Sequence, residues 1–419
     1  MTSSGGGAAG WLSPLLHSIP ELIGLDARRL RRFEETLRGL LAEYPLSPDP
    51  EPEPELRSRR LLHIRRELAQ RGHLAHAVPA RDGGSGGPIV AQTLMQFICG
   101  YHDADLRDST GLGHGSLIAR HATPPVRDRW LPRLLAGTLP GIAITEPHGG
   151  SQVHTTTTAA TICGDGVWAV TGTKIWISRL AEADVFTVFF KDPAGRLTAG
   201  VADATAGGLH RRRVLPAGLA GWSWGELRLD NVVLRTCDLL GGPGNGMALL
   251  RQHFAHYRPL VAATALGVAA AVHDQVATHL QQRRSAGVIP GLRDNALITL
   301  GRTYAQINAA LLAALNAQRL SDTGDPRAEM WGCAIKAHSA DVAHAAVSEL
   351  SLLTGAAGFT ASSPLAKAGR DVRALLYADG IHDSLYRAAG RALTSSGPAL
   401  GSAIAVPRPP HEVHNRLHA

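Results

Sequence analysis

The sequence predicts an α+β fold in which a helical N-terminal domain, a small central β-barrel and a C-terminal four-helix bundle follow one another. Apolar residues recur with helical spacing up to about residue 140, alternate with polar residues up to about residue 236, and then return to helical spacing. The chain has 419 residues, which is long for a single hydrophobic core, so we expect two or three domains. A hydrophobic content of 44% and a charged content of 18% are typical of a folded globular protein.

The pattern changes set the domain boundaries that we expect. Residues 1–24 predict a flexible leader, and a stiff proline-rich connector, "PLSPDPEPEPE", interrupts the first helical region. We expect the following divisions: leader 1–24, N-terminal helical domain 25–140, central β domain 141–245, C-terminal helical bundle 246–396 and flexible tail 397–419.

The central segment is predicted to hold several short strands that form a small antiparallel barrel. The stretches "TTTTAATI", "VWAVTGTKIWIS", "DVFTVFF", "LTAGVAD" and "GELRLDNVVL" are β-branched or alternating in polarity. Within the second stretch, "VTGT" (Val170 to Thr173) is a plausible hairpin turn. The glycine-rich "LLGGPGNG" then leads back into helix, where long amphipathic segments predict the bundle.

The charge of the chain does not indicate nucleic-acid binding. The formal net charge is +7 and the pI is about 9.6, which would suit an anionic substrate, carrier or surface. The densest basic group is Arg211 to Arg213, and a solvated face explains it equally well. We therefore expect no nucleic-acid partner.

The cysteines and the apolar runs exclude further classes of protein. Four cysteines lie far apart without a C-x-x-C pair, which indicates reduced thiols and neither a disulfide scaffold nor a metal site. The N-terminus has no basic segment followed by an apolar one, so no signal peptide is expected. The apolar run Pro259 to Val272 is too short to cross a bilayer and predicts a buried helix. We expect a cytoplasmic protein without membrane insertion.

A first group of polar residues lies where two predicted strands end. "AITEPHGGSQ" (Ala143 to Gln152) supplies the hydroxyls of Thr145 and Ser151, and "GTKIWIS" (Gly172 to Ser178) supplies the flat indole of Trp176 and the hydroxyl of Ser178. Such groups suit a planar heteroaromatic ring, and free N–H groups in the Gly149–Gly150 turn suit phosphate oxygens. An ordinary strand–loop–strand with Trp176 in the core is the alternative.

A second group lies near the C-terminus, in two polar breaks between helical segments. "TGAAGF" and "ADGIHD" interrupt an otherwise apolar helical run, and the second contains Asp379 directly before Gly380. This residue could be a catalytic carboxylate. The alternative is that Asp379 or Asp383 accepts hydrogen bonds from the N–H groups at the start of the last helix.

These two motifs resemble those of the acyl-CoA dehydrogenase family. "AITEPHGGSQ…GTKIWIS" is similar to T-E-P-x-x-G-S-D followed by G-x-K-x-W-I-T/S, and "TGAAGFTASSPLAKAGRDVRALLYADG" is similar to G-G-x-G-[FY] and P-x-x-x-x-x-R-D-x-R ending at Y-E-G-T. The resemblance covers roughly residues 60 to 395 and implies FAD as the cofactor. On matching positions it assigns to FAD the residues Ile144, Thr145, Ser151, Trp176, Ser178, Arg283, Asn295, Gly355 and Ala356. Because Arg283 matches an arginine that reaches the FAD of a neighbouring subunit, the resemblance also implies a homodimer or homotetramer.

On the substrate side the sequence departs from the family's pattern. Asp379 occupies the position of the usual catalytic Glu, and Tyr257 occupies the position where some members place that Glu instead. Asp379 is thus the only carboxylate at either position. The resemblance places Ser151, Arg258, Gly380 and His382 at the substrate.

The resemblance implies a FAD-dependent oxidoreductase that acts on an acyl thioester carried by CoA or by an acyl-carrier protein. Asp379 would remove the α-proton while the β-hydride goes to flavin N5, and an electron-transfer flavoprotein or O2 would reoxidise the flavin. Asp is one methylene shorter than Glu, so its carboxylate retracts by about 1.5 Å. Two alternatives remain open: a flavin-dependent monooxygenase or oxidase of the same fold that uses O2, and a catalytically degenerate member that binds flavin or acyl groups. Atypical members of the family are typical of secondary metabolism.

Overall fold

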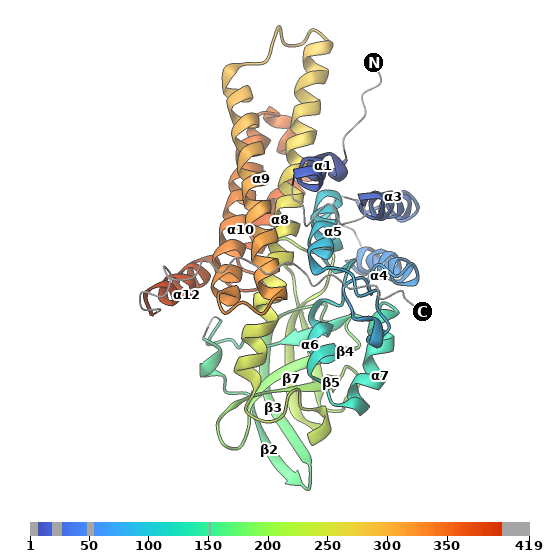
Figure 1. Cartoon of the computed structure of the whole chain (residues 1–419), viewed down its shortest axis with the longest axis vertical. Coiled ribbons are helices and arrows are strands. Elements are labelled where there is room, and N and C mark those ends of the chain that lie inside the picture. Colours follow the sequence, from blue (N-terminus) through green and yellow to red (C-terminus); the bar gives the residue numbers. More distant parts are fainter. Residues whose placement is uncertain (1–6, 19–26, 48–53, 151, 396–419) are drawn as a thin grey trace, which may run out of the picture.

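The structure is a computed structural model that describes residues 7–18, 27–47, 54–150 and 152–395. Figure 1 shows three regions: a long bundle around α8, α9 and α10, a sheet at one end of this bundle, and the N-terminal helices along the side of the bundle. The expected fold class is confirmed. The predicted tail 397–419 and much of the proline-rich connector lie outside the described residues.

The N-terminal region is helical: α1 and α3 pack against α5, whereas α6 and α7 pack against the sheet. The α-helices are α1 (Ala8–Ser18), α3 (Ala27–Glu43), α4 (Pro54–Gln70), α5 (Ile89–His102), α6 (Ser116–His121) and α7 (Pro124–Leu135). Helix α5 is apolar on nearly all sides and buried along most of its length. The 3-10 helix η2 (Ala104–Asp108) follows it and leads toward the sheet.

Helix α1 corrects the prediction of a flexible leader over Ala8–Ser18, which is the helical part of the expected segment 1–24. Ala8, Trp11, Leu12 and Leu15 recur with helical spacing, and all four side chains are buried in the core. The indole Nε1 of Trp11 donates a 2.9 Å hydrogen bond to the carboxylate of Asp274 on α8. The small residues that precede Trp11 obscured this short amphipathic pattern in the sequence.

The central region is a curled seven-stranded sheet. Its strands are β1 (Pro140–Ala143), β2 (Ala159–Gly164), β3 (Val167–Ser178), β4 (Val185–Lys191), β5 (Leu197–Asp203), β6 (Leu209–Val214) and β7 (Trp224–Arg235). The strand order is β1-β4-β2-β3-β7-β6, with β5 paired to β4. The pairing is mainly antiparallel, but β1 runs parallel to β4.

The predicted turn at Val170 to Thr173 is wrong, because these residues lie within the long strand β3. The chain reverses instead between β2 and β3, at residues 164–167. Gly172 has a φ of +157°, and a Cβ at this position would lie 2.3 Å from Oγ1 of Thr158. The glycine therefore permits a close approach inside the sheet, where a β-bulge interrupts the pairing with β7.

The C-terminal region consists of long helices. They are α8 (Gly246–Ser285), α9 (Asp294–Asp322), α10 (Ala328–Leu352), α11 (Pro364–Leu375) and α12 (His382–Ser395), with the 3-10 helix η6 (Gly355–Gly358) after α10. Helix α8 has 40 residues and is thus about 60 Å long. It is long and apolar enough to cross a membrane, but 78% of its most apolar window is buried inside the protein. This is the environment of a core helix, as the apolar run in the sequence predicted.

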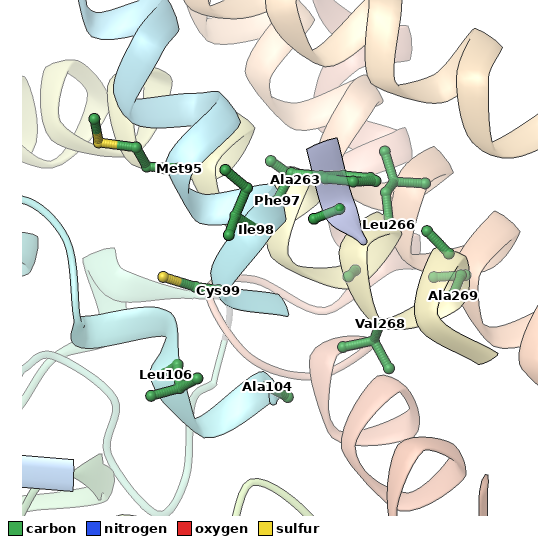
Figure 2. Close-up of a cluster of buried hydrophobic side chains, with 14 of the residues drawn as sticks. Met95, Phe97, Ile98, Cys99, Ala104, Leu106, Ala263, Leu266, Val268 and Ala269 are labelled. Carbon is green, nitrogen blue, oxygen red and sulfur yellow. The ribbon is translucent and has the colours of Figure 1, made fainter. Parts of the chain in front are cut away.

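Small residues allow α8 to approach α5 closely. A Cβ on Gly267 of α8 would lie 2.1 Å from the carbonyl oxygen of Phe97 on α5, so only glycine fits here. Phe97 and Ile98 pack beside Ala263 and Leu266 in this contact (Figure 2). The contact packs α5 tightly against α8 in the main hydrophobic core.

Candidate active site

A buried ion pair holds the loop after β1 against β3. The ammonium of Lys174 lies 2.8 Å from Oε1 of Glu146 and donates a 3.0 Å hydrogen bond to the carbonyl of Ile144. Glu146 also accepts hydrogen bonds from the backbone N–H groups of Thr157 and Thr158 and from three threonine hydroxyls. Burial alone would raise the pKa of Glu146, but the hydrogen bonds from Lys174 and these threonines hold it well below its usual value.

The ion pair between Lys174 and Glu146 places Thr145 beside Trp176. The N–H of Ile175 donates a 2.8 Å hydrogen bond to the carbonyl of Thr145, so the two residues lie next to each other at the edge of the sheet. The indole of Trp176 is 58% exposed, and its φ of 60° turns the side chain out of the strand. The alternative of a core tryptophan is therefore wrong.

The sheet edge fits a flat cofactor ring. The exposed indole offers a stacking surface, and the half-buried Thr145 hydroxyl has no hydrogen-bond partner among the described residues. Ile144 is half-buried in the same loop, whereas Ser151 lies outside the described residues. One detail of the phosphate prediction is corrected: the N–H of Gly149 is not free, because it donates to the carbonyl of Glu146 at 3.1 Å.

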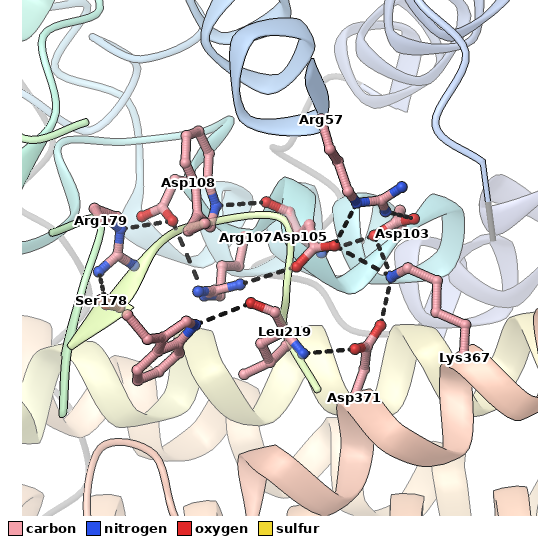
Figure 3. A network of polar contacts seen from close by, with 12 residues as sticks. Arg57, Asp103, Asp105, Arg107, Asp108, Ser178, Arg179, Leu219, Lys367 and Asp371 are labelled. Atoms are coloured by element: carbon pink, nitrogen blue, oxygen red, sulfur yellow. Dashed lines mark hydrogen bonds and ion pairs between the residues drawn. The ribbon is translucent and has the colours of Figure 1, made fainter. Parts of the chain in front are cut away.

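Ser178 ends β3 and leads directly into a buried charge network. The guanidinium of Arg179 donates a 2.6 Å hydrogen bond to Oγ of Ser178 and forms a 2.7 Å ion pair with Asp108 of η2. Arg179 has a φ of 60° and is almost completely buried. Figure 3 shows how this network continues through Arg107 and Asp105 to Lys367 and Asp371 on α11.

Asp379 lies in the connection between α11 and α12, where two cations hold the backbone. The buried Lys336 of α10 donates hydrogen bonds to the carbonyls of Leu375, at 2.7 Å, and Gly380, at 2.8 Å. Nε of Arg258 donates to the carbonyl of Asp379 at 3.3 Å. Asp379 has a φ of 57° and Gly380 a φ of 108°, so this sharp turn needs such support.

The carboxylate of Asp379 has no hydrogen bond or ion pair to another described residue, and its backbone N–H is likewise without an acceptor among them. The capping alternative is therefore not observed, and Asp383 is exposed at the start of α12. Burial raises the pKa of the Asp379 carboxyl, although Lys336, Arg179, Arg107 and Arg258 act in the opposite direction. A buried carboxylate of raised pKa without a partner among the described residues can take a proton from a bound substrate.

Tyr257 occupies the second position at which a carboxylate could have stood. It is buried on α8, stacks against His253 and lies with its ring centroid 4.5 Å from that of His114. Burial raises the pKa of its phenol, so the group remains a donor and cannot act as the base. Of the two positions, only that of Asp379 carries a carboxylate.

Of the other predicted substrate residues, Arg258, Gly380 and His382 lie near Asp379, whereas Ser151 lies outside the described residues. The contacts of Arg258 with the Asp379 carbonyl, the Cys333 sulfur and the ring of Phe254 give it a positioning role. The half-buried His382 begins α12, and its Nδ1 is buried without a hydrogen-bond partner. Direct contact of either residue with substrate stays a prediction.

Four of the predicted cofactor residues do not lie at this site within one chain. Arg283 and Asn295 flank the α8–α9 connection, at the end of the bundle that points away from the sheet (Figure 1). Arg283 lies 25 residues along α8 from Arg258, which is about 38 Å. The exposed Gly355 and Ala356, in η6, lie beyond the far end of α10 from Lys336. The predicted cofactor residues therefore fall into two groups that lie far apart within one chain.

Comparison with protein families shows which family the chain belongs to. Acyl-CoA dehydrogenase models match the chain domain by domain: the N-terminal domain at residues 32–138, the middle domain at 141–232 and the C-terminal domain at 244–394. The chain belongs to the acyl-CoA dehydrogenase family. FAD is the cofactor that this assignment supports, and the sheet edge fits it.

Individual relatives of this acyl-CoA dehydrogenase family chain are distant. A probable short/branched chain specific acyl-CoA dehydrogenase of Dictyostelium discoideum is 29% identical over 259 residues, which are 61% of this chain and 62% of that protein. A glutaryl-CoA dehydrogenase of Desulfococcus multivorans is 26% identical over 75% of this chain and 84% of its own length. An acyl-CoA dehydrogenase from Bacillus anthracis, solved in complex with FAD, has a TM-score of 0.76 at 20% identity and covers 88% of this chain and 67% of its own.

The sequence motifs missed the charged residues that surround the site. Arg107 and Asp108 lie in "DADLRDS", a dense charge cluster directly after an apolar helix, and Lys336 is the single lysine of α10. Charged residues are seldom buried unless they have partners. A charged residue inside an apolar run was therefore the sequence signal that could have indicated these buried charges.

Proposed function

We propose that this protein is a FAD-dependent dehydrogenase of acyl thioesters in which Asp379 removes the proton from the α-carbon. The observation that carries the proposal is the carboxylate of Asp379, which has a raised pKa and no partner among the described residues, in a turn whose backbone accepts hydrogen bonds from Lys336 and Arg258. The family assignment and the open sheet edge at Trp176 support the cofactor.

The chain's own residues have separate tasks in this proposal. Ile144, Thr145, Trp176 and Ser178 hold FAD, which when bound supplies the acceptor for the β-hydride. Asp379 receives the α-proton, and its free backbone N–H donates to the thioester carbonyl, which stabilises negative charge on that oxygen. Lys336 and Arg258 fix the backbone so that the short Asp side chain reaches its substrate.

We further propose a homo-oligomer in which Arg283, Asn295, Gly355 and Ala356 complete the cofactor site of a neighbouring subunit. The separation of about 38 Å between Arg283 and Arg258 supports this, because the two cannot serve opposite ends of one substrate-contacting flavin within one chain. Arg283→Glu should lower the FAD content of the purified oligomer, whereas the neighbouring Arg284→Glu serves as the control. Full FAD retention in Arg283→Glu would contradict the shared site. The four free cysteines agree with the cytoplasmic location that we propose.

The decisive experiment is anaerobic mixing of the purified flavoprotein with a panel of acyl-CoA and acyl-carrier-protein thioesters. Bleaching of the flavin absorbance by a thioester is expected for the wild type and not for Asp379→Asn, with equal FAD content in both. Asp383→Asn, which changes the exposed neighbour, should bleach like the wild type.

Two other outcomes would contradict the proposal. Oxygen consumption and substrate oxygenation in air, without anaerobic bleaching, would indicate a flavin monooxygenase or oxidase. Bound FAD that no thioester reduces and that consumes no oxygen would indicate a catalytically degenerate binding protein. Addition of an electron-transfer flavoprotein or O2 to the reduced protein then identifies the electron acceptor.

A further inference from the structure

We propose that Arg179 raises the reduction potential of the bound flavin, because its buried positive charge is held by a hydrogen bond to Ser178 and favours the negative charge that reduction adds to the ring. This inference rests on the part of the proposed function that places Ser178 at FAD, and it adds a residue that tunes the cofactor.

The end of β3 sends two nearby side chains in opposite directions. Trp176 and Arg179 both have a φ of 60°, a left-handed conformation that is strained for residues with a Cβ. The indole of Trp176 is 58% exposed, whereas Arg179 is 3% exposed. Strained backbone of this kind is concentrated at functional sites, so the inward course of the Arg179 side chain calls for an explanation.

The hydroxyl of Ser178 connects Arg179 to the open edge of the sheet (Figure 3). Nη1 of Arg179 donates a 2.6 Å hydrogen bond to Oγ of Ser178. A hydroxyl has one hydrogen to donate and two lone pairs that accept. The hydrogen of the half-buried Ser178 hydroxyl has no acceptor among the described residues, so it remains available to an acceptor atom of the flavin. The guanidinium then lies one hydroxyl away from the ring.

The positive charge of Arg179 is only partly offset by its partner. Its Nε forms a 2.7 Å ion pair with Asp108, and the same carboxylate oxygen lies 3.9 Å from Nε of Arg107. Burial would raise the pKa of Asp108, but Arg179, Arg107 and Arg65 hold it below its usual value. One ionised carboxylate is thus shared by three guanidinium groups.

The wider surroundings of Arg179 also carry an excess of positive charge. The network that runs from Arg179 to α11, taken together with the turn at Asp379, has more described cations than carboxylates. The cations are Arg57, Arg65, Arg107, Arg179, Arg258, Lys336 and Lys367, and the carboxylates are Asp103, Asp105, Asp108, Asp371 and Asp379. Burial lowers the pKa of the nearby His114 and raises the pKa of Tyr257, so both remain neutral and leave this excess unchanged.

Such an excess has a defined effect on a flavin. Charge close to the ring is one of the means by which a protein tunes this cofactor. Reduction makes the ring more negative, so a fixed cation in a buried, weakly screened position stabilises the reduced form relative to the oxidised form. Arginine suits this task because it stays charged at any working pH.

The test measures the reduction potential of the purified flavoprotein without any acyl thioester. The protein is reduced stepwise under anaerobic conditions beside a redox dye of known potential, and the two absorbances give the potential of the flavin. Arg179→Met should make the two-electron reduction about tenfold less favourable, which corresponds to a potential lower by about 30 mV. Arg179→Gln keeps an N–H donor for Ser178 without the charge and should show the same decrease, whereas Arg179→Lys keeps the charge and should retain most of the wild-type potential.

Asp108→Asn should change the potential in the opposite direction. It removes the counter-charge of Arg179 and keeps the shape of the side chain, so the potential should be higher than in the wild type, which a mere loosening of the site would not produce. This variant also decides the case if Arg179→Met does not fold or retain FAD, as judged by its thermal transition and the ratio of flavin to protein absorbance. Arg212→Met, which breaks an exposed ion pair with Glu226 on the same sheet, is the control and should leave the potential unchanged.

The results that would overturn the inference are separate from those that test the proposed function. A wild-type potential in Arg179→Met or in Arg179→Gln would overturn it, as would a potential in Asp108→Asn that is equal to or lower than that of the wild type. Bleaching by thioesters, on which the proposed function depends, plays no part in this measurement, so either can fail while the other stands. A purified protein that binds no FAD would overturn both together.

Discussion

The ammonium of Lys336 donates a 2.8 Å hydrogen bond to the carbonyl of Gly380, one residue after the carboxylate of Asp379. Lys336 is fully buried, and burial lowers its pKa to about 8. Because this buried lysine donates its hydrogen bonds to backbone carbonyls, it fixes the geometry of the turn that holds the proposed base.

Lys336→Met should therefore reduce turnover more than it reduces stability. The buried charge is removed with its desolvation cost, so the melting temperature should change little, whereas a shift of Asp379 by ~1 Å could cost on the order of 10²-fold in kcat. Steady-state kinetics with a measurement of FAD content separate the two effects. Lys191→Met, at the end of β4, is the control, and unchanged kcat in Lys336→Met would refute the positioning role.

Asp379→Glu should be slower than the wild type although it keeps the carboxylate. The longer side chain moves the carboxylate by ~1.5 Å, and the left-handed φ of 57° suits Asp better than Glu. We expect a loss of roughly tenfold to 10²-fold in the rate of flavin bleaching. A rate equal to or above the wild type would mean that the backbone is not adjusted to the shorter residue.

The pH profile of bleaching should report the same carboxylate. A base works when deprotonated, and burial raises the pKa of Asp379, so the rate should rise with pH through an apparent pKa above that of an ordinary aspartate. Stopped-flow bleaching across the acidic range, with unfolding monitored separately, measures this limb. The limb should be missing in Asp379→Asn, and its persistence there would assign it to another group.

Glu146→Ala should destabilise the protein strongly and reduce its flavin content. The change leaves Lys174 buried without its partner, which typically costs about 3–5 kcal/mol, and it frees the loop that positions Thr145. Thermal unfolding and the ratio of flavin to protein absorbance measure the two effects. Glu349→Ala breaks the exposed pair with Arg302 and should change stability by less than about 1 kcal/mol.

Two buried histidines should make the protein less stable in mild acid. Burial lowers the pKa of His253 and of His256 to about 3, with further lowering by nearby cations such as Arg120. Since the unfolded chain binds these protons below about pH 6.5 and the folded chain does not, stability is present above that pH and is lost as the pH falls toward 3. At pH 5.5 the loss should be about 1 kcal/mol for each histidine.

Denaturant unfolding at pH 7.5 and 5.5 measures this slope. His256→Asn should be less stable at neutral pH but should lose less stability on acidification, whereas the exposed His210→Asn should follow the wild type. An equal slope in His256→Asn and the wild type would exclude this histidine as the cause.

Single residues show how much of the fold and of the site could be predicted from the sequence. The order of helical, strand and helical regions was predictable because hydrophobic periodicity changes sharply at both boundaries. Local motifs singled out Trp176 and Asp379, and the roles of both residues at the site stay predictions. The turn at Val170 to Thr173 failed because a glycine that permits a close approach looks like a glycine that makes a turn.

The residues that surround the site could not be predicted from the sequence, for a different reason. Arg107 and Tyr257 lie about 150 residues apart in the chain. They line the same cavity only after α5 and α8 have packed. Pairing of buried charges such as Arg179 with Asp108 depends on tertiary geometry, which neither periodicity nor spacing encodes.

The packing of α1 has a practical consequence for recombinant work. A version trimmed to the region that the family models match would begin at residue 32 and would lose Trp11 and Leu12 from the interior. It would also remove the indole donor from Asp274, which accepts a further hydrogen bond from the hydroxyl of Tyr101. Poor yield or precipitation of such a shortened version would reflect an uncovered apolar strip and should not be taken as a sign of an inactive enzyme.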